Sequence, residues 1–250
     1  PGDAVDGRFV QAAGGSEAQE LAYALAGLAR VWRAAVAAGQ ESGAALARIP
    51  VTLTADQDQF ATIAKFRAAR RLIALMAGAA GVTTAPKLHA ETAWRMMAGL
   101  DVHTNLLRTT IAAFAAGVGG ADSLTVLPFT AALGLADGFA RRLARNTQRV
   151  LIDEAHIWRV ADPAAGSGAV EAETAALAAA AWARFQAIER AGGLHEAANG
   201  SFAADIRRVA AERARDVARR KLPLTGASDY PNLDEERPGV LAAAVAAVDA

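Results

Sequence analysis

Alanine-rich helical stretches alternate with short β-prone runs along residues 1–160. Apolar residues that recur every three or four positions predict helices, and short runs of β-branched and apolar residues predict strands. The predicted strands are residues 8–13, 49–54, 87–92 and 123–127. The helices predicted to follow them are residues 16–38, 56–78, 104–116 and 139–160. Ser16 and Gln19 have the spacing of a capping box at the start of the first helix.

Strands that alternate with helices of this length are typical of βαβ units around a parallel sheet. Four such units in series predict an α/β fold that is half of a (β/α)8 barrel, the TIM-barrel type. A half-barrel has two open sheet edges and an uncovered inner face. We therefore expect it to be completed by an N-terminal half, by another chain or by self-association. Pro1 is not a natural start, so we expect the chain to be trimmed, processed or cut from a longer protein.

The pattern changes to helices alone beyond Pro163. Residues 169–191 and 202–221 are predicted amphipathic helices, and residues 222–238 form a linker rich in proline and acidic residues. The last residues, 239–250, predict a short helix or a frayed tail. The expected division is therefore a half-barrel at 1–160, a helical extension at 161–221, and a linker with a tail at 222–250.

Composition excludes several classes of function. The 26 basic and 26 acidic residues leave no net charge, which argues against an extended nucleic-acid surface. The absence of cysteine excludes disulfides, thiolate catalysis and zinc–thiolate sites. No apolar run approaches the ~20 residues that span a bilayer, and the first residues lack the pattern of a signal peptide. We expect a cytoplasmic protein that binds neither nucleic acid nor membrane.

Six segments, in this order and at this spacing, carry a resemblance to a known family. They are residues 7–26, 63–72, 88–97, 105–129, 133–148 and 159–167. The chain resembles the barrel domain of methylmalonyl-CoA mutases from about Asp6 to Asp234, and more closely their small, non-catalytic subunit. Residues 224–236 look like the segment that joins the small subunit's barrel to its cobalamin-type domain.

The resemblance implies a barrel that holds a CoA ester along its axis. In the family's active subunit, a flavodoxin-like domain carries adenosylcobalamin, and the reaction is a radical rearrangement between methylmalonyl-CoA and succinyl-CoA. The cofactor supplies that chemistry, and the protein orients the substrate and excludes water.

The chain departs from the active subunit at its functional positions. Phe9 stands where the active pattern has a histidine, and a phenyl ring can neither donate a hydrogen bond nor act as a general acid. In the third predicted strand, Glu91 replaces an amide and Trp94 replaces a glycine, while His89 and Thr92 are kept.

Further losses follow along the chain. Thr130, Ala131 and Ala132 replace an Asp-Glu-Ala run, and Gly168 and Ala169 replace an aromatic pair. The cobalt-ligand motif Asp-x-His-x-x-Gly is absent from the sequence. The resemblance therefore implies a chain with no catalytic residue, no bound metal and no cofactor of its own.

Gln11, His89 and Glu91 are the candidate substrate-binding residues, and the last two are also the candidates by position for any catalytic role. His89 and Glu91 lie on the same side of their strand by the two-residue period. Such a pair either tunes the pKa of a proton donor or is a hydrogen-bonded pair without a function inside a barrel filled by side chains. The basic residues Arg108, Arg141, Arg142 and Arg145 either meet CoA phosphates or belong to solvated and structural helix faces.

The preferred hypothesis is a non-catalytic partner that supports a large mutase subunit, the chain that would bind adenosylcobalamin. One alternative is an acyl-CoA mutase half-barrel with altered specificity, completed by another chain. The other is a module that binds a CoA ester without chemistry. The expected partners are the large subunit or the missing N-terminal half of the barrel, with a homo-oligomer as a further possibility.

Overall fold

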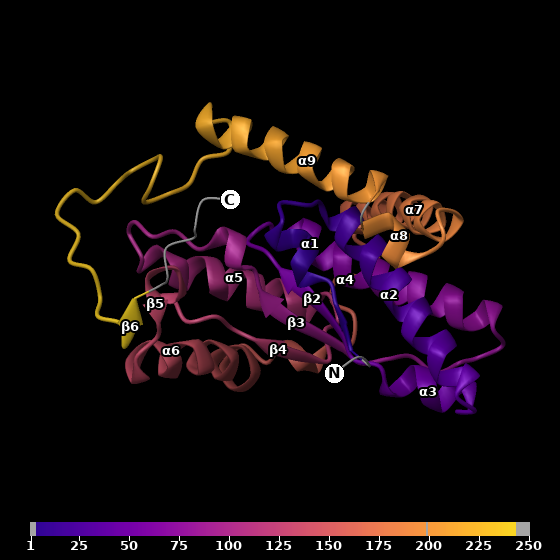
Figure 1. Cartoon of the computed structure of the whole chain (residues 1–250). Coiled ribbons are helices and arrows are strands. Elements are labelled where there is room, and N and C mark those ends of the chain that lie inside the picture. The colour runs from indigo at the N-terminus through magenta and orange to yellow at the C-terminus, as the bar shows by residue number, and fades with distance from the viewer. Residues whose placement is uncertain (1–3, 199, 244–250) are drawn as a thin grey trace.

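Four parallel strands form one sheet in the order β1-β2-β3-β4. The computed structural model describes residues 4–198 and 200–243 (Figure 1). The strands are β1 (Val5–Asp6), β2 (Val51–Ala55), β3 (Leu88–Thr92) and β4 (Ser123–Thr125). Each leads to a longer helix: α2 (Glu17–Ala37), α4 (Gln59–Ala79), α5 (Thr104–Val118) and α6 (Gly138–Arg149). This confirms the predicted α/β fold of four βα units, the TIM-barrel type in part.

Shorter elements connect and flank these units. The connections contain α1 (Arg8–Ala12), α3 (Ser42–Arg48), the 3-10 turns η1 (Trp94–Met96), η2 (Ala131–Leu133) and η4 (Ile157–Arg159), and the π-helical turn η3 (Val150–Glu154). The C-terminal region contains α7 (Gly168–Arg190), α8 (Leu194–Ala198) and α9 (Ser201–Ala218). Two short strands, β5 (Gly134–Leu135) and β6 (Ala242–Ala243), pair antiparallel.

Side-chain caps start α2, α4 and α6, and the sequence predicted the first of them. The Ser16 hydroxyl accepts a hydrogen bond from the Gln19 N–H, and the Gln19 side chain accepts one from the Ser16 N–H at 2.9 Å, so the predicted capping box is confirmed. Asp58 caps α4 and Asp137 caps α6 with a single bond each, in which the carboxylate accepts from the N–H of Ala61 or Ala140.

The strand predicted at residues 8–13 is wrong. The first strand ends at Asp6, and its carboxylate accepts a hydrogen bond from the Arg8 N–H at 3.0 Å, which turns the chain. Residues 8–12 then form α1, with Val10 and Gln11 buried and Phe9 exposed. The helix predicted at 139–160 is also wrong beyond Arg149, because a π-helical turn and then left-handed His156 (φ 52°) end it. The short helices α3 and α8 were not predicted.

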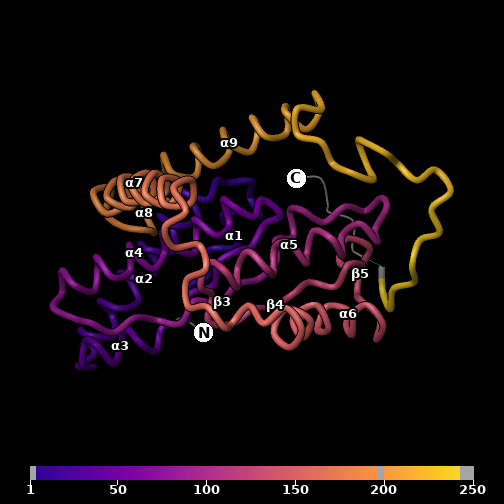
Figure 2. The backbone as a smooth tube through the Cα atoms, turned by 180° about the vertical axis from the view of Figure 1, so that it is seen from behind, coloured from indigo at the N-terminus to yellow at the C-terminus, as the bar shows by residue number. Residues whose placement is uncertain are grey.

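The main core lies between the sheet and the helices that cover one of its faces. It joins apolar residues of β2 and β3 to α2, α4 and α5. Helix α7 packs across α2 and α4 as a second layer and adds Phe185 and Ile188 to the same core. Many of the buried residues are alanines, which let the helices approach the sheet closely. Figure 2 shows the helices and the sheet from behind.

A buried ion pair joins two helices to the sheet. The Lys65 Nζ lies 2.7 Å from Glu20 Oε2, and both side chains are 0% exposed. Thr54 completes the cluster: its hydroxyl contacts both charged groups, and its N–H donates to Glu20 Oε1 at 2.6 Å. Burying the two charges is costly, and these hydrogen bonds offset that cost by satisfying the remaining polar atoms. The cluster fixes α2, α4 and the end of β2 relative to one another.

The sheet is open at both edges. Within the described part of the chain, β1 and β4 each have a neighbouring strand on one side only. No helix in the described residues is long and apolar enough to cross a membrane. Residues 222–241 contain no helix or strand, whereas most of the predicted tail lies outside the described residues. The division into three regions stays a prediction.

The first testable prediction concerns the buried ion pair. Lys65→Met leaves the Glu20 carboxylate buried without its cation, so we expect the free energy of unfolding to fall by about 3–5 kcal/mol. Urea unfolding followed by circular dichroism measures this. Lys87→Met is the matched control: its side chain is 80% exposed, so its loss should cost about 0–1 kcal/mol. Equal unfolding midpoints for the two variants would contradict the assignment.

Candidate functional site

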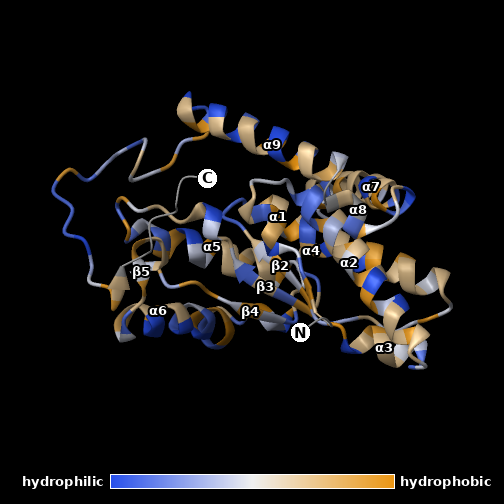
Figure 3. Ribbon diagram, in the orientation of Figure 1, coloured by the Kyte–Doolittle hydropathy of each residue, from blue (hydrophilic) through white to orange (hydrophobic). Residues whose placement is uncertain are grey.

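The face of the sheet opposite the covering helices is polar. The two-residue period and the strand register place the following side chains on it: Asp6, Thr52, Thr54, His89, Glu91, Ser123 and Thr125. A closed (β/α)8 barrel usually fills this space with layers of Val, Ile and Leu. The hydrophilic colour of β3 is visible among the apolar segments in Figure 3. This face, called the inner face below, is the candidate functional site.

Arg8 links two strands across the inner face. Its guanidinium pairs with Asp6 at 2.7 Å and with Glu91 at 2.7 Å, so it reaches from the end of β1 past β2 to β3. Burial raises the pKa of Asp6, but the hydrogen bonds and charge of Arg8 outweigh burial and hold that pKa below its usual value. The same hydrogen bond to Asp6, with a further contribution from Glu91, raises the pKa of Arg8.

His89 has a hydrogen-bond partner on each ring nitrogen. Its Nδ1 lies 2.8 Å from the Ser123 hydroxyl, and its Nε2 lies 3.0 Å from the Thr125 hydroxyl. A hydroxyl both donates and accepts, so either tautomer of the neutral ring is satisfied. His89 and Glu91 therefore share a face, as predicted, but have separate partners: two hydroxyls of β4 for the histidine and Arg8 for the glutamate.

Gln11 belongs to a different cluster. It lies on α1, is 2% exposed, and donates from Nε2 to Asp56 Oδ2 at 3.0 Å. Arg95 donates to the same carboxylate oxygen at 3.1 Å and to the Gly15 carbonyl at 2.8 Å. These bonds tie the connections after β1, β2 and β3 together at the carboxyl ends of the strands. Gln11 as a substrate ligand stays a prediction, as do His89 and Glu91.

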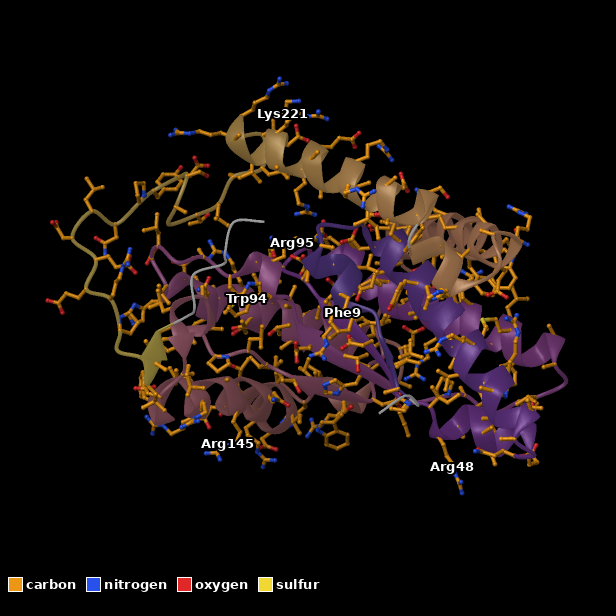
Figure 4. All side chains as sticks on the ribbon, viewed as in Figure 1. Phe9, Arg48, Trp94, Arg95, Arg145 and Lys221 are labelled. Carbon is orange, nitrogen blue, oxygen red and sulfur yellow. The ribbon has the colours of Figure 1, made fainter. Side chains whose placement is uncertain are left out.

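Two exposed aromatic side chains lie at the carboxyl ends of the strands. Phe9 on α1 is 68% exposed and Trp94 on η1 is 53% exposed, and these two elements contact each other. Figure 4 shows both near Arg95 in the middle of the molecule, whereas Arg48, Arg145 and Lys221 point outward at its periphery. Neither aromatic side chain has a group suited to general acid or base catalysis.

Arg8, Asp56 and Arg95 of these clusters escaped the sequence reasoning. They were not singled out, although Arg8 follows Asp6 at a spacing that suits a local ion pair. Arg108 was considered for CoA phosphates, but its guanidinium is buried and donates to Asn105 and to the Thr225 carbonyl. No sequence signal joins Arg108 to a residue so distant in the chain. Within the described residues, no group of three His, Cys, Asp or Glu side chains could hold a metal ion.

The family model described as methylmalonyl-CoA mutase matches residues 4–249. This chain belongs to the methylmalonyl-CoA mutase family.

Several of the relatives are named as small subunits. The chain is 47% identical over 238 residues to the probable methylmalonyl-CoA mutase small subunit of Mycobacterium tuberculosis, covering 92% of this chain and 38% of that protein. It is 47% identical over 234 residues to the small subunit of Streptomyces virginiae, with the same coverage. For Propionibacterium freudenreichii subsp. shermanii the identity is 43% over 232 residues, covering 91% of this chain and 36% of that protein. The chain therefore spans less than two-fifths of the length of these relatives.

The second prediction concerns the pKa of Asp6. Because its pKa is lowered in the folded state, Asp6 adds stability above its unfolded pKa of about 3.9, and that stability is lost as the pH falls through the folded value. Arg8→Met removes the cation, so the Asp6 pKa should rise toward its unfolded value, and the stability that Asp6 adds at neutral pH and loses in acid should shrink or vanish. Carboxyl-carbon NMR titration measures the shift. Arg48→Met, on an exposed site of α3, should leave the Asp6 titration unchanged, and an unchanged titration in Arg8→Met would refute the assignment.

Proposed function

We propose that this chain is the second half of the barrel in a small, non-catalytic subunit that supports a larger methylmalonyl-CoA mutase subunit. The names of the relatives support the small-subunit assignment. The single observation that carries the non-catalytic role is the inner face, where the polar groups are already bound to one another. Arg8 is held by two carboxylates, and both nitrogens of His89 are hydrogen-bonded.

The charge of the inner face also argues against turnover of a CoA ester. Asp6 and Glu91 carry two negative charges against the single positive charge of Arg8. The phosphates of CoA would be repelled by this net negative charge in a confined space. At the position of the family's histidine, Phe9 offers no donor to a thioester carbonyl and no acid for proton transfer.

The residues of this chain do not fit the role of a cobalt ligand. His89 is held on the inner face by two hydroxyls, and His103 stacks on Phe129 with ring centroids 5.1 Å apart. His156 occupies the left-handed turn after η3, and none of the histidines has the Asp-x-His-x-x-Gly context. In this proposal, adenosylcobalamin belongs to the large subunit, and no step of the reaction passes through this chain.

The open edges and the inner face support two further parts of the proposal. Four more strands, paired with β1 and β4, would close the barrel and enclose the inner face. We assign those strands to the N-terminal half of the same subunit, and the larger mutase subunit is then the partner of the completed barrel. Residues 1–160, 161–221 and 222–250 serve in it as half-barrel, helical extension, and linker with tail.

A second candidate function is a CoA-ester binding module without chemistry. The observation that favours it is the polar inner face itself, because hydroxyl and imidazole groups suit a polar ligand better than aliphatic layers do. Isothermal titration of methylmalonyl-CoA or succinyl-CoA into the full-length subunit distinguishes the two. We expect no binding heat; saturable binding would favour the module.

The third prediction tests catalysis directly. The full-length small subunit should show no cobalamin-dependent mutase activity alone, and activity should appear when the large subunit is added. In that complex, His89→Ala should change kcat by less than about twofold, because loss of a general acid or base usually costs 10²–10⁴-fold.

Arg48→Ala provides a baseline for substitutions away from the inner face. Turnover by the small subunit without its partner would refute the proposal. So would a loss of kcat of about a hundredfold or more in His89→Ala with the complex still assembled.

A further inference from the structure

Residues 222–243, called the strap below, link α9 to β6 and return to the carboxyl side of the sheet. In Figures 1 and 2 the strap is the yellow segment that leaves α9, sweeps away from the helices and comes back beside β5. A segment rich in proline and acidic residues is typical of a flexible linker. Instead, the strap makes specific contacts with the connections after β3 and β4.

The first contact is a buried guanidinium. Arg108 is 7% exposed, donates to Asn105 Oδ1 at 2.7 Å, and donates to the carbonyl of Thr225 in the strap. Burial lowers the pKa of Arg108, against the nearby charge of Asp101, which raises it. Asn105 is itself buried and bonded to the backbone at Ala98 and Phe129, so the strap is anchored to a rigid part of the barrel.

The second contact is a close approach of backbone to side chain. Gly226 has φ +82°, and a Cβ there would lie 2.5 Å from Asp101 Oδ2 and 2.6 Å from Asp101 Cβ. Asp101 also has a left-handed backbone, with φ 44°. A non-glycine residue in this conformation persists where its surroundings hold it in place. Only glycine therefore fits both the conformation and the space at position 226.

Two more contacts secure the remainder of the strap. Glu235 accepts a hydrogen bond from the Val102 N–H at 2.9 Å, and the N–H groups of Val102 and Asp101 hold the pKa of Glu235 below its usual value. The Leu241 N–H donates to the Leu135 carbonyl at 2.8 Å, next to the β5–β6 pairing. The four contacts are distributed along the strap, and all of them fall on the connections after β3 and β4.

We propose that the strap is a docked positioning element, with Arg108 and Asp101 as its seat on the barrel. It fixes the position of β6 relative to the carboxyl ends of the strands. Arg108 is a positioning residue in this account and binds no phosphate. The inference rests on intramolecular contacts alone and does not depend on the proposed function.

Hydrogen–deuterium exchange read at two amides tests the strap. The Val102 N–H reports the Glu235 contact, and the Leu241 N–H reports the contact with β5. Gly226→Val places a side chain against Asp101 from the strap side, and Arg108→Gln removes the anchor from the barrel side. In both variants, exchange at Val102 and Leu241 should accelerate by about tenfold or more. The Ala90 amide in β3 should stay protected, which shows that the barrel is folded.

Gly239→Ala is the matched control, because Gly239 lies in the same strap and a Cβ there meets nothing within 4 Å. Its exchange rates should equal those of the unmodified chain. The proposal is overturned if Val102 and Leu241 already exchange in the unmodified chain at the rate of an unfolded peptide. It is also overturned if both rates are unchanged in Gly226→Val and in Arg108→Gln.

Discussion

The two faces of the sheet impose opposite requirements on their surroundings. One face is apolar and packs against α2, α4 and α5, whereas the other carries an ion-pair network and a histidine between two hydroxyls. Polar groups of this kind need water or hydrogen-bonding partners, so the inner face cannot become a second apolar core. In the proposed function, a neighbour closes the barrel around this polar face, and the open edges of β1 and β4 are where it would attach.

The proposed role in a mutase complex follows from how polar groups are used around the sheet. Between the helices and the end of β2, Glu20, Thr54 and Lys65 satisfy one another and hold the helices in place. On the inner face, Arg8 and Glu91 form an ion pair with each other. Neither charged group is therefore free to bind a substrate. In the proposed role, a chain that binds its own functional groups in this way keeps the family's fold and has no chemistry of its own.

Local patterns in the sequence predicted most of the fold. They could not predict which side chains far apart in the chain bond to each other. The capping box of Ser16 and Gln19 and the four βα units follow from short-range rules. The segment after Asp6 was misassigned because five mostly apolar residues suit a strand or a helix, and a side-chain bond from Asp6 decides between them. The common face of His89 and Glu91 could be predicted from strand period, but their partners depend on which strands become neighbours.

Thiol accessibility of the inner face tests the central claim most directly. The chain has no cysteine, so Ser123→Cys introduces a single thiol on the inner face, and Ala183→Cys on the exposed side of α7 serves as reference. The account predicts that Cys at 123 reacts with a maleimide as fast as the reference in this chain alone. It predicts protection of at least about tenfold once the N-terminal half of the barrel is present, while the reference stays reactive. Equal reactivity at position 123 in the two states, or protection already in this chain alone, would contradict an open half-barrel completed by further strands.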